Sequence, residues 1–226
     1  MGLPTTIAID GPAASGKSTL GVLLAQALGY LYFDTGVMYR ALTLAALQRG
    51  LNVHDEAAIG ALAETVHIDV GPPSVEDGRD CDVFLDGQDV TWEIRSDAVN
   101  SFVSDVSVYA AVRKAMTDQQ RRIAYANKVV VVGRDIGSVV IPDADLKIYL
   151  DASAEVRAQR RYQEMINRGE AADYEAVLRS LKNRDQIDST REIAPLKVVE
   201  DAVVINSDDL GIEEVLEKAK ELVYRV

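Results

Sequence analysis

The segment Gly11–Ser18 constrains the fold of this chain more than any other. It reads Gly-Pro-Ala-Ala-Ser-Gly-Lys-Ser, so four residues separate two glycines, and a lysine and a hydroxyl follow. A short apolar run, Thr5–Asp10, precedes the segment, and an apolar helical pattern, Lys17–Leu28, overlaps its end. Strand, glycine-rich loop and helix, in that order, form the context that a phosphate-binding loop requires. Inward-facing backbone N–H groups and the positive end of the helix dipole bind anions there.

This motif predicts that the chain binds a nucleoside triphosphate together with Mg²⁺. Lys17 is placed to reach the β- and γ-phosphates, and the hydroxyl of Ser18 is placed to ligate Mg²⁺. The alternative is a glycine-rich turn before an ordinary helix, and it leaves the filled positions of the motif unexplained. The residues expected at the triphosphate are Gly11, Pro12, Ala13, Ala14, Ser15, Gly16, Lys17, Ser18 and Thr19.

Composition excludes several classes of partner. The formal net charge of −12 disfavours nonspecific binding to nucleic acids or to anionic membranes. Cys81 is the only cysteine, so no intramolecular disulfide forms, as is usual in a reducing compartment. No apolar run approaches the length of a membrane span, and the N-terminus lacks a signal-peptide pattern. We therefore expect a cytoplasmic, monomeric protein with small-molecule substrates.

The arginines are distributed unevenly. The chain has 16 arginines and 8 lysines, and seven of the arginines lie between Arg157 and Arg191. A guanidinium group matches phosphate oxygens in a bidentate manner, so this stretch fits a phosphate site. Acidic residues lie nearby in the sequence, so a solvated, salt-bridged helical face fits the spacing equally well.

Strand and helix patterns alternate along the chain, which predicts an α/β fold with a parallel sheet covered by helices. Several of the strand patterns are nearly continuous apolar runs, as in strands buried on both faces. The expected strands are Thr5–Asp10, Tyr30–Phe33, Val129–Val132, Leu146–Leu150 and Ala202–Asn206. The expected helices are Lys17–Leu28, Val37–Arg49, Ser107–Ala126, Ala154–Arg168, Asp173–Gln186 and Gly211–Arg225.

One segment interrupts the alternation. Three short β-like pieces, His67–Val70, Asp82–Asp86 and Gln88–Thr91, are separated by turn residues, and Asp86-Gly87 is a hairpin signal. We expect a small β-rich insertion over residues 66–103, beside a core domain formed by residues 1–65 and 104–226.

Three polar clusters accompany the phosphate-binding loop. Asp34–Arg40 and Gly133–Asp135 follow buried strands, where open α/β sheets bind ligands. The third cluster, Arg184–Arg191, lies in the arginine-rich stretch and is predicted as a polar loop.

Together these motifs resemble the cytidylate kinases of bacterial type, within the nucleoside-monophosphate kinases, and the resemblance runs along essentially the whole chain. The segments that carry it are Ile9–Pro12, Gly16–Thr19, Asp34–Arg40, Gly133–Gly137, Leu150–Ser153 and Ile193–Leu196. Thr35 stands where relatives often have serine, and the hydroxyl is kept. The resemblance implies a P-loop fold with a monophosphate-binding insertion and a helical lid over about residues 157–169. It also implies phosphoryl transfer from ATP to CMP or dCMP with Mg²⁺.

The resemblance further assigns roles to individual side chains. The catalytic group would be Lys17, Arg134, Arg160 and Arg191, and Arg157 would contact ATP, although neighbouring Arg161 is an alternative to either lid arginine. The CMP-binding group would be Thr35, Tyr39, Arg40, Ser104, Arg113, Arg134, Asp135, Arg184, Asp188 and Arg191. In this group Asp135 would accept a hydrogen bond from the cytosine amino group. The alternative for Asp135 is that it holds Arg134 in place.

Two other functions fit parts of the sequence. The first is another small-molecule kinase with the same loop, acting on a different nucleotide or on a metabolite such as shikimate. The β-rich insertion and Gly133–Asp135 disfavour it. The second is a nucleotide-dependent switch without a phosphoryl acceptor, which leaves the remote arginine clusters unexplained.

Overall fold

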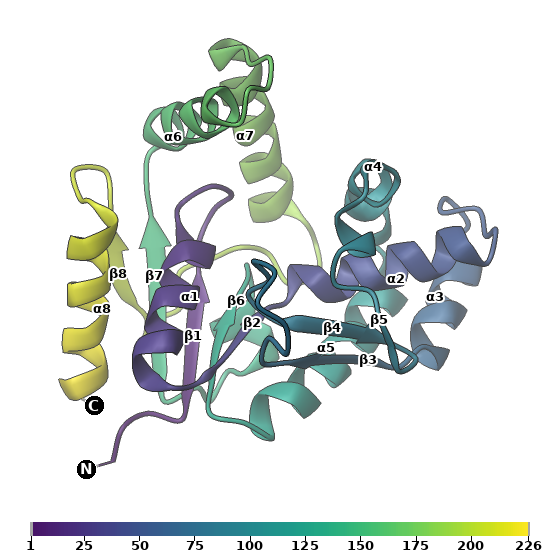
Figure 1. The fold of residues 1–226 in the computed structure, drawn as a ribbon, viewed down its shortest axis with the longest axis horizontal. Coiled ribbons are helices and arrows are strands. Elements are labelled where there is room, and N and C mark those ends of the chain that lie inside the picture. Colours follow the sequence, from purple (N-terminus) through teal and green to yellow (C-terminus); the bar gives the residue numbers. More distant parts are fainter. Residues whose placement is uncertain (1, 226) are drawn as a thin grey trace.

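A computed structural model of the protein describes residues 2–225 and contains a central sheet of five parallel strands. The strand order across the sheet is β2-β6-β1-β7-β8 (Figure 1). The strands are β1 (Thr6–Asp10), β2 (Leu31–Asp34), β6 (Val129–Val132), β7 (Leu146–Asp151) and β8 (Val203–Asn206). All five expected strands are confirmed, with their ends shifted by about one residue.

Burial on both faces of the sheet explains the continuous apolar runs. In β1, Ile7 and Ile9 belong to one apolar cluster, whereas Ala8 between them belongs to another. In β6, Val130 and Val132 belong to the first cluster and Val129 and Val131 to the second. Successive side chains of a strand point to opposite faces of the sheet. A strand that is covered on both faces is therefore apolar at successive positions and shows no polar–apolar alternation.

Helices cover the two faces of the sheet. On one face, α1 (Lys17–Leu28) and α8 (Ile212–Arg225) pack against β1, β6 and β7. The cluster on the other face contains residues of α2 (Gly36–Gln48), α3 (Glu56–Thr65) and α5 (Ala110–Tyr125). The observed architecture is therefore the predicted α/β fold.

The β-rich segment forms a separate antiparallel sheet. Its strands are β3 (Ile68–Gly71), β4 (Asp82–Leu85) and β5 (Gln88–Asp89). Asp86 and Gly87 have φ angles of 50° and 83° and form the expected hairpin turn. A 3₁₀ turn (Glu93–Arg95) and helix α4 (Asp97–Val106) then lead to α5. The buried face of this small sheet shares its apolar cluster with the main sheet.

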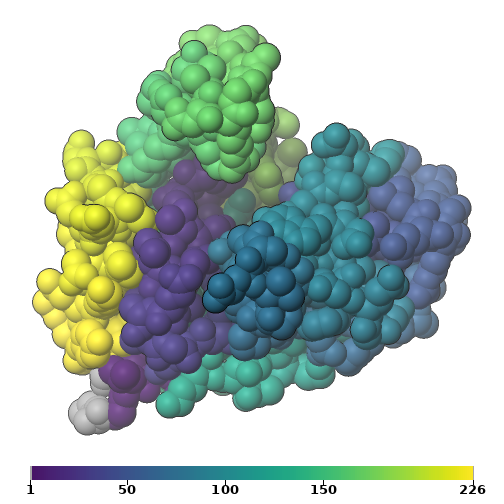
Figure 2. All heavy atoms as spheres, viewed as in Figure 1, coloured from purple at the N-terminus to yellow at the C-terminus, as the bar shows by residue number. Residues whose placement is uncertain are grey.

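Two helices that pack against each other stand above the carboxyl ends of the strands. They are α6 (Ala154–Asn167) and α7 (Tyr174–Thr190), drawn in green in Figure 1. Their own buried cluster is small and consists of Ala13, Ala158 and Leu181. Figure 2 shows the surface hollowed between this helix pair and the teal segment that contains α4.

The predictions for secondary structure were wrong in four places. Helices α3 and α4 were not anticipated, although Asp55 gives α3 an N-cap by accepting a hydrogen bond from the N–H of Ala58. Residues 187–190, which were expected as loop after the helix predicted to end at Gln186, continue α7, because no glycine or proline interrupts them. The helix expected from Ser107 starts at Ala110, after α4 has ended. Within residues 2–225, no helix is both long enough and apolar enough to span a membrane.

Candidate active site

The phosphate-binding loop connects β1 to α1 and depends on two of its glycines. Gly11 has a φ of 150°, and a Cβ atom built on it would lie 2.1 Å from the carbonyl oxygen of Leu150. Gly16 has a φ of 93° and is the N-cap residue of α1. Neither position accepts another residue without strain. The backbone therefore follows β7 closely and then turns its N–H groups towards the start of the helix.

A cavity of about 630 Å³ opens beside this loop, and residues from the whole chain line it. Basic side chains outnumber acidic ones two to one in the lining, although the chain as a whole is strongly acidic. Such an excess of positive charge is suited to two phosphorylated ligands. The basic side chains are Lys17, Arg40, Arg113, Arg134, Arg160, Arg161, Arg184 and Arg191, and the acidic ones are Asp34, Asp135, Glu164 and Asp188.

Lys17 is folded back against its own loop. Its Nζ atom donates to the carbonyl oxygen of Pro12 at 2.5 Å and to the Oγ atom of Ser15 at 3.3 Å. Burial, and then the neighbouring Arg134 guanidinium, hold the pKa of Lys17 well below its usual range. An incoming phosphate would counteract both effects, because its negative charge stabilises the protonated form of Lys17.

The first turn of α1 offers oxygen ligands for a cation. The hydroxyl of Ser18 lies 3.4 Å from Oδ2 of Asp34, whose Oδ1 accepts a hydrogen bond from the N–H of Gly36 at 2.9 Å. Residues 2–225 contain no cluster of three or more His, Cys, Asp or Glu side chains suited to a metal. Two oxygens without a full protein cage fit Mg²⁺, which retains waters and binds substrate phosphates. The sequence analysis assigned Ser18 to Mg²⁺ and gave Asp34 no metal-binding role.

Two carboxylates and three arginines form a network across the cavity floor. The Asp135 carboxylate accepts from Nη2 of Arg113 at 2.7 Å and from Nη2 of Arg191 at 3.3 Å. The Asp188 carboxylate accepts from Nε of Arg134 at 2.9 Å, and Nη1 of Arg191 lies 3.8 Å from it. The alternative role suggested for Asp135, holding Arg134, is wrong, because α7 brings Asp188 to that guanidinium instead.

Comparison with known proteins places this arrangement in a family. The model of the cytidylate kinase family matches residues 7–225. A cytidylate kinase of Herpetosiphon aurantiacus is 51% identical over 96% of this chain and 93% of its own length. One from Caldicellulosiruptor bescii is 48% identical over 97% of this chain and 96% of its own. The chain belongs to the cytidylate kinase family. An uncharacterized protein from Eubacterium ventriosum shares the fold alone, with a TM-score of 0.50, 12% identity and coverage of 97% and 98%.

The remaining residues that the cytidylate kinase resemblance assigned to CMP lie around the same cavity. Tyr39 lies beneath the guanidinium of Arg113, whose carbon atom is 5.7 Å from the ring centre. Arg40 donates to the carbonyl oxygen of Ile94 and to Asn100, so it connects α2 to α4. The other three are Thr35, Ser104 and Arg184.

Two of these residues differ in how free they are to bind a substrate. The hydroxyl of Thr35 already donates to the carbonyl oxygen of Val132 at 3.1 Å and so joins the ends of β2 and β6. Arg184 makes no side-chain hydrogen bond within the described residues, and burial, followed by the positive charge of Arg134, lowers its pKa. Arg184 is therefore an available guanidinium on α7.

The structure separates the two arginines assigned to the lid of this cytidylate kinase family member. Arg160 lines the main cavity but donates to the Oγ atom of Ser207 at 3.1 Å and to the carbonyl oxygen of Leu210 at 3.4 Å. Arg157 is buried outside that cavity, where it binds Asp185 and donates to the carbonyl oxygen of Ala13 at 2.9 Å. It therefore supports the phosphate-binding loop from behind.

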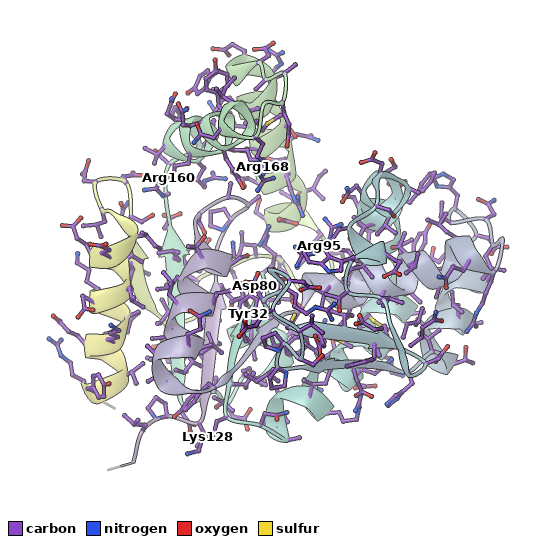
Figure 3. The ribbon with its side chains drawn as sticks, in the orientation of Figure 1. Tyr32, Asp80, Arg95, Lys128, Arg160 and Arg168 are labelled. Atoms are coloured by element: carbon purple, nitrogen blue, oxygen red, sulfur yellow. The ribbon has the colours of Figure 1, made fainter. Side chains whose placement is uncertain are left out.

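The helix pair presents two further charges, Arg161, which the sequence analysis gave as an alternative to the lid arginines, and Glu164, to which it gave no role. Arg161 and Glu164 of α6 line the cavity, and Nη1 of Arg161 donates to Oε2 of Glu164 at 2.8 Å. Figure 3 shows Arg160 and Arg168 on the α6–α7 side, with Arg95 across the opening on the insertion side. The spacing of charges along α6 predicts that these side chains are exposed. It does not predict which of them face the cavity, because that depends on how the helix packs against the rest of the protein.

Proposed function

We propose that this protein transfers the γ-phosphoryl group of ATP to CMP, giving ADP and CDP, and that it also accepts dCMP. The observation that carries the proposal is one cavity in which a phosphate-binding loop faces an excess of guanidinium groups. A nucleoside triphosphate and a monophosphate repel each other, so a site that binds both needs compensating charge. Membership of the cytidylate kinase family supports this choice of acceptor.

The phosphate-binding loop would hold the ATP phosphates. Lys17 would leave the carbonyl oxygen of Pro12 and approach the β- and γ-phosphates, where its positive charge is compensated. Ser18 and Asp34 would hold Mg²⁺, which supplies charge neutralisation at the triphosphate when bound. Arg160 and Arg161 of α6 would approach the same phosphates from above.

CMP would lie across the network on the cavity floor. Arg40, Arg134 and Arg191 would hold its phosphate, and Arg184 and Asp188 would contact its ribose. Asp135 would accept a hydrogen bond from the cytosine amino group while Arg113 donates to the ring, as the pattern of donors and acceptors on cytosine requires. Ser104 would complete the pocket from α4.

The chemistry needs no general base. The second pKa of a phosphate monoester is about 6, so the attacking oxygen is already anionic near neutral pH. Catalysis would come from alignment of the two substrates and from positive charge around the transferring group. The arginines of the cavity supply the positive charge. The carboxylates that hold several of them keep these arginines in fixed positions, which favours alignment.

A coupled assay of ADP release with CMP, dCMP, UMP and AMP tests the proposal. We expect CMP to exceed UMP in kcat/KM by at least about tenfold, since uracil would place a carbonyl opposite the Asp135 carboxylate. A kinase for another metabolite would release no ADP with any of the four. A switch would be stabilised thermally by triphosphate but not by CMP alone. Either result would overturn the assignment.

We further infer that the protein works as a monomer in the cytoplasm. Size-exclusion chromatography with light scattering tests whether it is a monomer.

A further inference from the structure

The loop that carries Arg134 and Asp135 ends in an unusual turn. Residues Ile136–Val140 form a single π-helical turn, in which the N–H groups of Val139 and Val140 both donate to the carbonyl oxygen of Asp135. Such turns are rare and occur frequently at functional sites. The geometry of this turn sets the direction in which the two preceding side chains enter the cavity.

A buried carboxylate holds the start of this turn. Oδ1 of Asp10 accepts from the N–H of Ile136, and Oδ2 accepts from the N–H of Gly137, both at 2.8 Å. Asp10 is the last residue of β1 and directly precedes Gly11 of the phosphate-binding loop. One side chain therefore links the loop expected to bind ATP to the loop expected to bind CMP.

The other end of the turn is held by an arginine of α5. Nε of Arg121 donates to the carbonyl oxygen of Val140 at 2.9 Å, and Nη2 donates to that of Val139 at 2.7 Å. The space around the turn is also limited, because a Cβ atom on Gly137 would lie 3.1 Å from Cδ of Lys147. The turn is thus fixed by Asp10 at one end and by Arg121 at the other.

Asp10 is poorly explained by a contribution to stability alone. Its side chain is in the interior, and burial raises its pKa to about 6 even though two N–H groups donate to it. Folding therefore disfavours the ionised form of this carboxyl group. By contrast, Oδ2 of Asp145 accepts from the N–H groups and the hydroxyls of Thr5 and Thr6 at the opposite end of β1. Although partial burial opposes them, these hydrogen bonds lower the pKa of Asp145.

We propose that Asp10 is a positioning residue that fixes Arg134 and Asp135 in register with the phosphate-binding loop, so that the two phosphoryl groups meet in line. It touches neither substrate and acts through the backbone of residues 136 and 137. The proposal rests on the proposed function for the identity of the two substrates.

The test compares Asp10→Asn with the control Asp145→Ala, which removes a carboxylate at the opposite end of β1. An asparagine at residue 10 has one acceptor oxygen for two N–H donors, so one contact is lost. We expect KM for CMP to rise and kcat to fall, with kcat/KM lower by about ten- to a hundredfold, as misplacement of reacting groups produces. The preference for CMP over UMP should also shrink. The affinity for the Mg²⁺ complex of a non-hydrolysable ATP analogue should stay within about twofold.

The control separates positioning from support of the fold. Asp145→Ala removes the oxygen that accepts from Thr5 and Thr6, far from the cavity, so it should lower the melting temperature and leave KM, kcat and base preference unchanged. In Asp10→Asn, hydrogen exchange should quicken at the amides of residues 136 and 137. Wild-type kinetics in that variant, or an equal loss of ATP-analogue affinity, would overturn the proposal.

A second variant covers the case in which Asp10→Asn does not fold. Arg121→Met releases the other end of the turn from outside the cavity, and it should change the CMP parameters in the same direction by a smaller factor. Unchanged CMP parameters in Arg121→Met would then count against the proposal. Wild-type protein that fails to phosphorylate CMP refutes the proposed function instead, while exchange at residues 136 and 137 still reports whether Asp10 fixes the turn.

Discussion

Replacing Arg113 by methionine would separate the structural role of the buried ion pair from its role at the base. Arg113 and Asp135 are joined at 2.7 Å, and their side chains are only 5% and 10% exposed. Methionine keeps much of the volume and removes the charge. Asp135 then keeps a single partner, Arg191 at 3.3 Å, so its negative charge is only partly compensated.

The expected loss of stability follows from that geometry. Removing one member of a buried ion pair costs about 3–5 kcal/mol, and the remaining contact to Arg191 favours the lower end, about 3 kcal/mol. For a chain of this length, each kcal/mol shifts the melting temperature by about 2–4 °C. Arg113→Met should therefore melt about 6–12 °C below the wild type.

The double variant Arg113→Met/Asp135→Asn makes the prediction specific. It contains neither charge, so at least about 1.5 kcal/mol of the stability should return as a coupling energy between neighbouring sites. The preference for CMP over UMP should not return, because the groups proposed to read the base are still missing. Thermal melts and the ratio of kcat/KM for CMP and UMP measure the two effects in the wild type, in Arg113→Met, in Asp135→Asn and in the double variant.

Two results would refute this reasoning. If Arg113→Met melted within about 2 °C of the wild type, the buried pair would contribute far less than its geometry implies. If the double variant recovered base preference together with stability, Asp135 would serve only to balance the arginine charge. The proposed contact to the cytosine amino group would then be abandoned.

Further predictions concern charge, movement and pH. Lys17→Met should lower kcat by about a thousandfold or more without lowering the melting temperature, as activity assays and thermal melts would show; near-normal turnover would contradict the assignment of the loop. Residues 157–169 and the insertion should gain protection from hydrogen exchange with a bisubstrate analogue, and unchanged exchange would exclude closure. Because Asp10 has a raised pKa in the folded state, its contribution to stability should fall as the pH rises from about 4.5 to 6. Denaturant unfolding of the wild type should therefore lose about 1.5 kcal/mol relative to Asp10→Asn over that interval; parallel pH profiles would refute the shift.

Local sequence patterns predicted most of the elements that place the site. The glycine spacing in residues 11–18 and the apolar runs of β1 and β6 are local features, so the sheet and its phosphate-binding loop could be read directly. Helix α4 was missed although Val99, Phe102 and Val106 recur at helical spacing, because residues 66–103 were assigned to the β-rich insertion. Its N-terminal residue Asp97 follows a 3₁₀ turn whose presence depends on packing against α2.

The pairing of charges was beyond the reach of the sequence. Arg134 and Asp135 are neighbours in the chain, yet they bind different partners, Asp188 and Arg113, which come from α7 and α5. Those partners are set by the tertiary arrangement of helices separated by many residues. The same holds for Arg157, since its assignment to ATP from the family resemblance could not anticipate its burial beneath the phosphate-binding loop.

The unequal sharing of apolar contacts has a consequence for how such chains can change over evolutionary time. The small sheet of β3, β4 and β5 is built into the same apolar cluster as the main sheet, so an altered length there would disturb both. Helices α6 and α7 rest on only a small cluster around Ala158 and Leu181. The tip of their hairpin, residues 168–173, belongs neither to this cluster nor to the cavity lining, so descendants of a common ancestor can lengthen, trim or exchange that tip while the rest of the molecule keeps its architecture.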